Sequence, residues 1–303
     1  METADEFWRM YEQLSLRLKK KYLKKTHFSD SLDHFTKLAK HLDEERCPQY
    51  AAFCSLAVAK CEQSMGNGLQ EAKAYTDAAE YFMRAHLDSG ELNYEEHLSA
   101  ALQAYSAAVK IYIEQGQTSA AGVLLLKIGN KLTWAKKPDE AVIFFQRGNE
   151  INQSFPSAFM TGMEGLILCL VLSKDHLEAL NTLIAYMHYL HSRTDTTLEP
   201  YRSTLGRCKL QLVLLSIVTQ DALTKMYEPQ QKLWDVFEAV HFTNPIAELN
   251  AEIFFTIQSI MLAVKYREVN SFQVAINSCY AYWNSLERTL LQEISESLYC
   301  KSN

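Results

Sequence analysis

The sequence predicts an all-α fold, built as an α-solenoid of antiparallel helical hairpins with about 14 helices and no sheet. It contains only 10 glycines and 6 prolines in 303 residues, and β-sandwiches and barrels need frequent turns of these residues. Apolar residues make up 48% of the chain, too many for a disordered protein. The apolar residues also recur at helical spacing, as in Leu98, Ala101, Leu102 and Tyr105, which predicts helices that pack through one face.

The prolines and glycines divide the chain into helical blocks. Proline is tolerated at the first position of a helix, where its missing N–H would have no partner. All six prolines stand where a helix could begin: Pro48, Pro138, Pro156, Pro200, Pro229 and Pro245. In chain order the expected helices cover residues 3–24, 29–42, 48–65, 69–88, 91–115, 117–135, 138–152, 156–173, 175–192, 199–220, 229–241, 245–267, 270–284 and 286–300.

Short connections between these blocks predict that neighbouring helices are antiparallel. No Gly/Ser-rich linker interrupts the chain, so we expect one helical-repeat domain over residues 1–303, with a change of packing near 192–200.

One segment, residues 125–151, matches the tetratricopeptide repeat. The repeat requires large residues and a Leu-Gly-like pair in its first helix, and small residues around an aromatic in its second. The matching positions are Leu125, Ile128, Gly129, Leu132, Ala141, Phe145 and Gly148. Small residues at these sites let the paired helices approach each other. The other hairpins match the pattern less well, so we expect them to be degenerate repeats.

Nothing in the sequence predicts catalysis, a cofactor site or a metal site. The P-loop, nucleophile-elbow, zincin and kinase motifs are absent, and Gly66-Asn67-Gly68 follows a helical block and is expected to be a turn. Cys47, Cys54 and Cys61 are seven residues apart and predict a buried, reduced stripe. The histidines at helical spacing are expected to be ordinary solvated or dipole-stabilising side chains; they are His27, His34, His41, His188 and His191.

The net charge of −6 speaks against a nucleic-acid partner, because such domains are usually basic. The stretch Leu18–Lys25 is basic, and we expect a solvated helix face there, with an acidic partner or phosphate as the alternative. The acidic first ten residues do not resemble a signal peptide, and no apolar stretch is long enough to span a bilayer. We therefore expect a soluble cytoplasmic protein with no membrane insertion.

The aromatic-rich C-terminal region offers candidate partner contacts, since aromatic residues dominate binding hot spots. Glutamates with few basic neighbours in the same region predict an acidic patch that faces a basic partner surface. The candidate interface residues are Phe254, Phe255, Tyr282, Trp283, Glu252, Glu268, Glu287 and Glu293.

The stretch Glu45–Ser64, with the basic run before it, resembles the family of 40-kDa huntingtin-associated proteins. Shorter stretches at Glu114–Ala121, Phe144–Arg147 and Leu290–Ser295 resemble the same family, so the resemblance runs nearly end to end. It implies a non-catalytic helical adaptor that binds huntingtin, a large HEAT-repeat protein, as an obligate 1:1 complex and stabilises it. It also implies a link to an early-endosomal Rab GTPase and vesicle motility, in the cytoplasm, at early endosomes and in the nucleus.

Relatives in that family have a long Pro-rich insertion that would fall near Ser192–Tyr201, where this chain has only a short connector. The resemblance therefore carries no role of the insertion over to this chain. The repeat pattern also resembles tetratricopeptide adaptors of the vesicle-fusion class, the soluble NSF-attachment proteins, which leaves a different protein partner as the alternative. An enzyme with a helical cavity and a helical-repeat RNA-binding protein are disfavoured, because neither convergent polar residues nor regular base-reading positions are visible.

Overall fold

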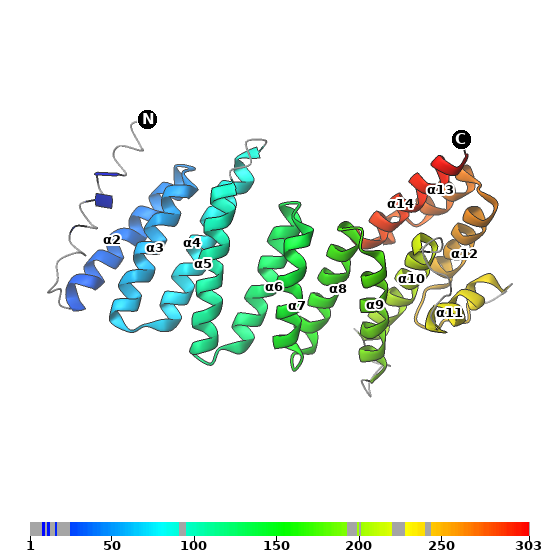
Figure 1. Ribbon diagram of the computed structural model, residues 1–303, viewed down its shortest axis with the longest axis horizontal. Coiled ribbons are helices and arrows are strands. Elements are labelled where there is room, and N and C mark those ends of the chain that lie inside the picture. The colour runs from blue at the N-terminus through cyan, green and yellow to red at the C-terminus, as the bar shows by residue number, and fades with distance from the viewer. Residues whose placement is uncertain are drawn as a thin grey trace. The chain divides into compact units, whose positions relative to one another are not determined.

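The computed structural model describes residues 8–9, 11–12, 16, 25–90, 95–192, 199, 201–219, 228–239 and 244–302. Within these residues the chain forms thirteen α-helices, one short 3-10 helix and no strand (Figure 1), which confirms the all-α class. Most of the expected first helix, 3–24, lies outside the described residues, as do positions 18–24 of the basic stretch and most of the connector at 192–200.

The helices follow the predicted blocks closely in most places. They are α2 (Lys25–Glu44), α3 (Pro48–Met65), α4 (Gly68–Asp88), α5 (Glu95–Glu114), α6 (Thr118–Trp134), α7 (Pro138–Asn152), α8 (Pro156–Leu172), α9 (His176–Ser192), α10 (Tyr201–Thr219), α11 (Glu228–Glu238), α12 (Ala251–Tyr266), α13 (Val269–Ser278), the 3-10 helix η2 (Tyr280–Tyr282) and α14 (Ser285–Ser302). From α2 to α7 each helix packs against the next one in the chain (Figure 1), and α9 with α10 and α12 with α13 form further pairs. This sequential hairpin packing confirms the predicted architecture.

The hairpin of α6 and α7 shows why the repeat needs small residues. A Cβ atom on Gly129 would lie 2.8 Å from the Phe145 ring, and one on Gly148 would lie 2.7 Å from Leu126. The two helices therefore approach more closely than a side chain at either glycine would allow. The large positions of the pattern, Leu125, Ile128, Leu132 and Phe145, are buried between them.

Several helices end in a residue with left-handed backbone conformation, which closes the turn to the next helix. Gly66 ends α3 in this conformation, with a φ of 79°. Four other turns use a basic residue instead, with φ between 57° and 62°: Arg46, Lys136, Lys174 and Arg267. A cation at this end suits the helix dipole, although a side chain in this conformation costs about 1–2 kcal/mol.

The prediction for the prolines holds at four described positions and is wrong at Pro245. Pro48, Pro138 and Pro156 begin their helices, and Pro229 is the second residue of α11. Pro245 instead lies in an irregular segment just before the turn that precedes α12.

That turn is closed by the Asn244 side chain, which accepts a hydrogen bond from the Ile246 N–H (2.9 Å) and donates one to the Leu249 carbonyl (2.6 Å). Asn250 then caps α12 by accepting from the Glu252 N–H at 3.1 Å. Two asparagines therefore delay the helix start by six residues, because side-chain hydrogen bonds to the backbone compete with the helix.

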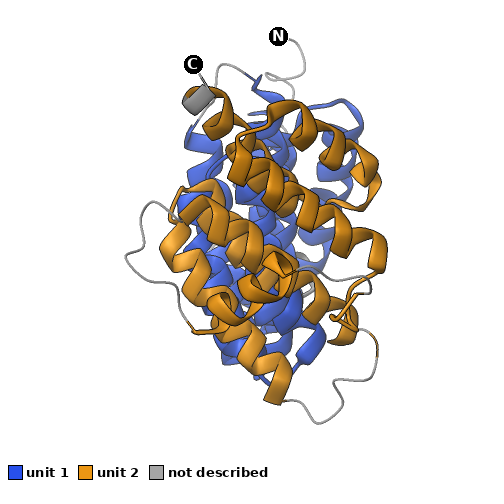
Figure 2. Ribbon diagram, turned by 90° about the vertical axis from the view of Figure 1, so that its right-hand side faces the viewer, with its two compact units in different colours: residues 1–162 blue, residues 163–303 orange. Residues whose placement is uncertain are grey.

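The chain divides into two compact units, residues 1–162 and 163–303, coloured separately in Figure 2. The division falls inside α8 rather than at the change of packing expected near 192–200. That residues 1–303 fold as one domain stays a prediction.

The longest apolar stretches of the sequence serve as core. Leu210, Leu214 and Leu215 of α10 are fully buried, as is Val171 of α8. No helix among the described residues combines the length and the apolar character that crossing a membrane requires.

Candidate partner-binding surface

One side of α12 exposes apolar side chains to solvent. Phe255, Leu262 and Tyr266 are 37%, 54% and 68% exposed. Their spacing of seven and then four residues places them along one side of the helix. We call these three residues the α12 stripe. An apolar row that no described part of the chain covers is typical of a protein-binding surface.

The opposite side of α12 belongs to the core of unit 163–303. Phe254 is fully buried and stacks on Phe237 of α11, with 4.8 Å between ring centroids. The prediction that Phe254 meets a partner directly is therefore not supported by its position, whereas its neighbour Phe255 is exposed. Adjacent helical residues differ by about 100° in direction, and here only Phe254 points into the core.

Trp283 is also a core residue. It is buried, and its indole N–H donates to the Ile276 carbonyl at 3.0 Å. A side chain held in this way offers no surface to a partner. Tyr282 is half-buried, and the Arg207 guanidinium lies 4.8 Å from the centre of its ring. Tyr282 remains a candidate through the part of its ring that solvent reaches.

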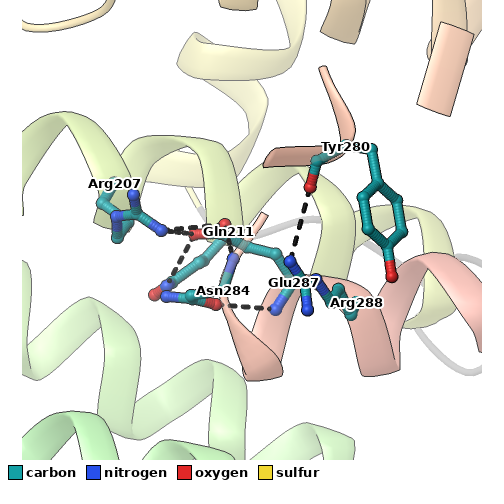
Figure 3. A network of polar contacts seen from close by, with 6 residues as sticks. All are labelled: Arg207, Gln211, Tyr280, Asn284, Glu287 and Arg288. Carbon is teal, nitrogen blue, oxygen red and sulfur yellow. Dashed lines mark hydrogen bonds and ion pairs between the residues drawn. The ribbon is translucent and has the colours of Figure 1, made fainter. Parts of the chain in front are cut away.

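Glu287 lies at the centre of a buried polar network that joins α10 to α14 (Figure 3). Arg207 donates to both carboxylate oxygens at 3.1 and 3.0 Å, and the Gln211 amide donates at 3.2 Å. At the start of α14 the Asn284 N–H donates to Glu287 at 2.9 Å, and the Asn284 side chain accepts from the Glu287 N–H at 3.0 Å. These two reciprocal bonds form a capping box.

Burial raises the pKa of Glu287, and the hydrogen bonds and positive charge around it oppose that shift. The predicted role of Glu287 on an acidic surface does not fit this environment, because solvent does not reach its carboxylate. Its position assigns it to holding α14 against α10.

The other predicted glutamates do not form one uniform patch. Glu293 pairs with Lys174 and bonds to the His176 ring, each at 2.6 Å. Glu252 is exposed in the first turn of α12, and Glu268 is exposed before α13, where it accepts from the Ser271 hydroxyl at 2.7 Å. Only Glu252 and Glu268 therefore keep exposed carboxylates without a cationic partner among the described residues.

The histidines and cysteines singled out in the sequence have local roles. The rings of His34 and His191 bond to carbonyls one turn earlier in their own helices, at 2.6 and 2.7 Å. Cys54 and Cys61 are buried, which raises their thiol pKa values to about 12 and about 11. Within the described ranges, no three potential metal ligands converge. The side chain of His27 lies outside those ranges.

A groove in unit 163–303 was not predicted from the sequence. It has a volume of about 740 Å³ and lies between α10, α11, α12 and α14. Its apolar residues include Trp234, Met261 and Leu262, so it adjoins the α12 stripe through Leu262. The only sequence feature that could have indicated the groove is that α12 has apolar residues on more than one side. This feature does not tell which side the neighbouring helices cover.

Known proteins are similar to this chain over most of its length. Residues 21–157 match the family model for soluble NSF attachment protein, SNAP. The 40-kDa huntingtin-associated proteins of Rattus norvegicus and Mus musculus are each 27% identical over 331 aligned residues, which cover 89% of this chain and 87% of theirs.

The alignment is longer than the 303 residues of the chain, so the relatives contain residues with no counterpart here. The sequential hairpins of α2 to α7 overlap the SNAP match, and the similarity to the two relatives extends over both units. The chain is therefore a homologue of the 40-kDa huntingtin-associated protein, with a tetratricopeptide-like helical segment of the SNAP type.

Proposed function

We propose that this chain is a non-catalytic helical adaptor that binds huntingtin as an obligate 1:1 complex and stabilises it. The proposal is supported first by similarity to two proteins whose names state association with huntingtin, over 89% of this chain. The observation in the structure that carries it is the α12 stripe, three exposed apolar side chains on one side of a helix. Obligate interfaces are more hydrophobic than transient ones, and such a stripe suits one.

Phe255 is the member of the stripe that was also a candidate in the sequence. Together with Tyr282, Glu252 and Glu268, it makes four of the eight candidates that are neither buried nor, among the described residues, in an ion pair. We propose that these residues contribute to the partner contact, whereas Phe254, Trp283 and Glu287 act through the fold.

The direct test is to co-express the full chain with huntingtin and to measure co-purification and thermal melting. We expect a stoichiometric complex on size-exclusion chromatography and a higher melting temperature for the complex, because binding to the folded state stabilises it. Huntingtin that elutes separately from the chain would contradict the proposal.

The stripe is tested by the double variant Phe255→Asp/Tyr266→Asp. Both side chains are exposed, so we expect the fold to persist while the yield of complex falls about tenfold or more. Val274→Asp on α13 is the matched control, because Val274 is 71% exposed and lies outside the stripe. Equal yields for the two variants would assign the contact to another surface.

The alternative is an adaptor of the vesicle-fusion class, and the SNAP match over residues 21–157 favours it for the N-terminal part of the chain. A pull-down with tagged chain, probed for huntingtin and for the NSF ATPase, separates the two. Recovery of NSF without huntingtin would support the alternative.

We extend the proposal to a cytoplasmic location and a link to early endosomes through a Rab GTPase. This extension is supported only by the resemblance to the huntingtin-associated family. Imaging of the tagged chain with an early-endosome marker tests it, and an unchanged distribution after removal of huntingtin would contradict a link through the complex.

A further inference from the structure

More of the residues that line the groove of unit 163–303 are apolar than polar. Its volume is about 740 Å³, and the apolar side chains around it include Trp234, Phe237, Met261, Leu262, Ile294 and Leu298. Three of the four surrounding helices, α11, α12 and α14, contribute these six residues. Apolar grooves of this kind bind the apolar face of an amphipathic helix.

Most polar groups in the groove already have partners. The Gln258 amide donates to the Phe237 and Ala239 carbonyls at 3.1 and 3.0 Å, which closes the end of α11. Lys265 pairs with Glu238 at 2.7 Å. Glu293 is bonded to Lys174 and His176, as described above. These groups are therefore not available to select the charge of an occupant.

Arg267 is the exception among the charged residues of the groove. It follows the last residue of α12, and its left-handed backbone is fixed by hydrogen bonds from its N–H to the end of that helix. The residue is exposed and lines the groove. No carboxylate pairs with it in the part of the chain that the structure describes, so its guanidinium is free to bind an anionic group.

We infer that this groove accepts an amphipathic helix of the protein partner, with the apolar face of that helix in the groove and an acidic side chain paired with Arg267. The inference rests on the proposed function for the identity of the partner, but not for the chemistry of the groove. Charge complementarity selects the acidic residue, since Arg267 is the unpaired charge and a guanidinium pairs well with a carboxylate.

The α12 stripe favours a helix over a small amphiphile such as a fatty acid. Leu262 belongs both to the stripe and to the groove, and Tyr266 extends the apolar surface beyond the groove. A single acyl chain would occupy part of the groove and leave that surface exposed. A helix about 10 Å in diameter covers both.

The first arm of the test uses full-length huntingtin and the full chain. We expect Leu262→Asp and Arg267→Glu each to weaken binding about tenfold, and Val274→Asp to leave it within about twofold. Arg267→Glu should also reduce the dependence of binding on salt, because a charge pair is screened by ions. Wild-type affinity in both groove variants would overturn the inference.

The second arm is independent of huntingtin. Its probes are two 18-residue amphipathic helical peptides with the same leucine face, one with a single Glu and one with Lys in its place, titrated against the full chain while Trp234 emission is followed. We expect the Glu peptide to bind at least about fivefold more tightly, and Arg267→Glu to abolish that difference.

Dodecanoate is the third probe. The Trp234→Phe variant identifies which part of the tryptophan emission change comes from the groove. Saturation of the groove by one dodecanoate, with no binding of either peptide, would overturn the inference in favour of a small-amphiphile site. Binding of the Glu peptide without binding of huntingtin would support the groove and contradict the proposed function. Equal binding of the two peptides would overturn the predicted role of Arg267.

Discussion

Glu287 and Arg207 show how a single buried ion pair fixes the position of a helix. The Glu287 side chain is fully buried and that of Arg207 is about one-third exposed, so the carboxylate depends on protein donors for its hydrogen bonds. Arg207, Gln211 and the Asn284 N–H supply them. Removal of one partner from such a pair is costly because the other charge stays behind.

We predict that Glu287→Gln destabilises the protein by about 3 kcal/mol, measured by urea denaturation. Gln retains the size of the side chain but leaves the Arg207 charge unpaired. The double variant Glu287→Gln/Arg207→Met is the control, because it removes that charge and should recover part of the loss. A single variant as stable as the wild type would show that the pair contributes nothing.

Glu80 gives a pH-dependent prediction at the same scale. Burial raises its pKa, but hydrogen bonds from Lys127, Tyr105 and Lys131 lower it more, so the pKa lies below its ordinary value of 4.5. In the unfolded chain the group protonates near that ordinary value. Its stabilising effect is therefore complete above about pH 4.5 and is lost as the pH falls through the lower pKa of the folded state.

We predict that Glu80→Gln loses about 1–2 kcal/mol at neutral pH and that the difference from wild type shrinks as the pH falls below about 4.5. Unfolding free energies measured between pH 7 and pH 3 test this. The Tyr105→Phe variant, which removes one donor at 2.6 Å, should show a smaller loss of the same kind. A difference that is constant with pH would contradict the assignment.

At the scale of elements, the turns between helices carry measurable strain. Lys136 follows α6 with a φ of 59° and closes the turn into α7. Glycine adopts this conformation without the steric cost of a Cβ atom but loses more conformational freedom on folding. We predict that Lys136→Gly stabilises the chain by about 0.5–1 kcal/mol, measured by thermal denaturation.

Lys136→Ala is the control for that turn, since alanine removes the charge but keeps the Cβ atom. We expect no gain in stability from it. A gain in stability in both variants would show that removal of the lysine charge, rather than relief of backbone strain, causes it.

At the scale of the whole molecule, the division at residue 162 raises the question of cooperativity. Gly129→Val would place a side chain against the Phe145 ring in unit 1–162, at a cost of about 1–3 kcal/mol. Glu287→Gln destabilises the other unit. If residues 1–303 fold as one domain, as predicted, both variants lower the same single transition in circular dichroism and in tryptophan fluorescence. Two transitions that shift separately would contradict the single domain.

Much of the fold could be predicted from residue spacing. The matched repeat at 125–151 is buried as expected, since small and large residues alternate there in a pattern that only paired helices satisfy. The start of α12 could not be predicted from Pro245, because Asn244 and Asn250 form competing side-chain bonds. The sequence indicated the C-terminal region that contains the α12 stripe. Of the three residues of the stripe, it named only Phe255.

The sequence by itself determined the class, the order and the approximate bounds of the helices, because these depend on local periodicity and on residues that begin or end a helix. It also carried the similarity to the huntingtin-associated proteins. Only the tertiary structure decided which of two neighbouring aromatics is covered. Phe254 packs on Phe237 and Phe255 faces solvent, since the choice depends on how α11 packs against α12, which local periodicity does not determine.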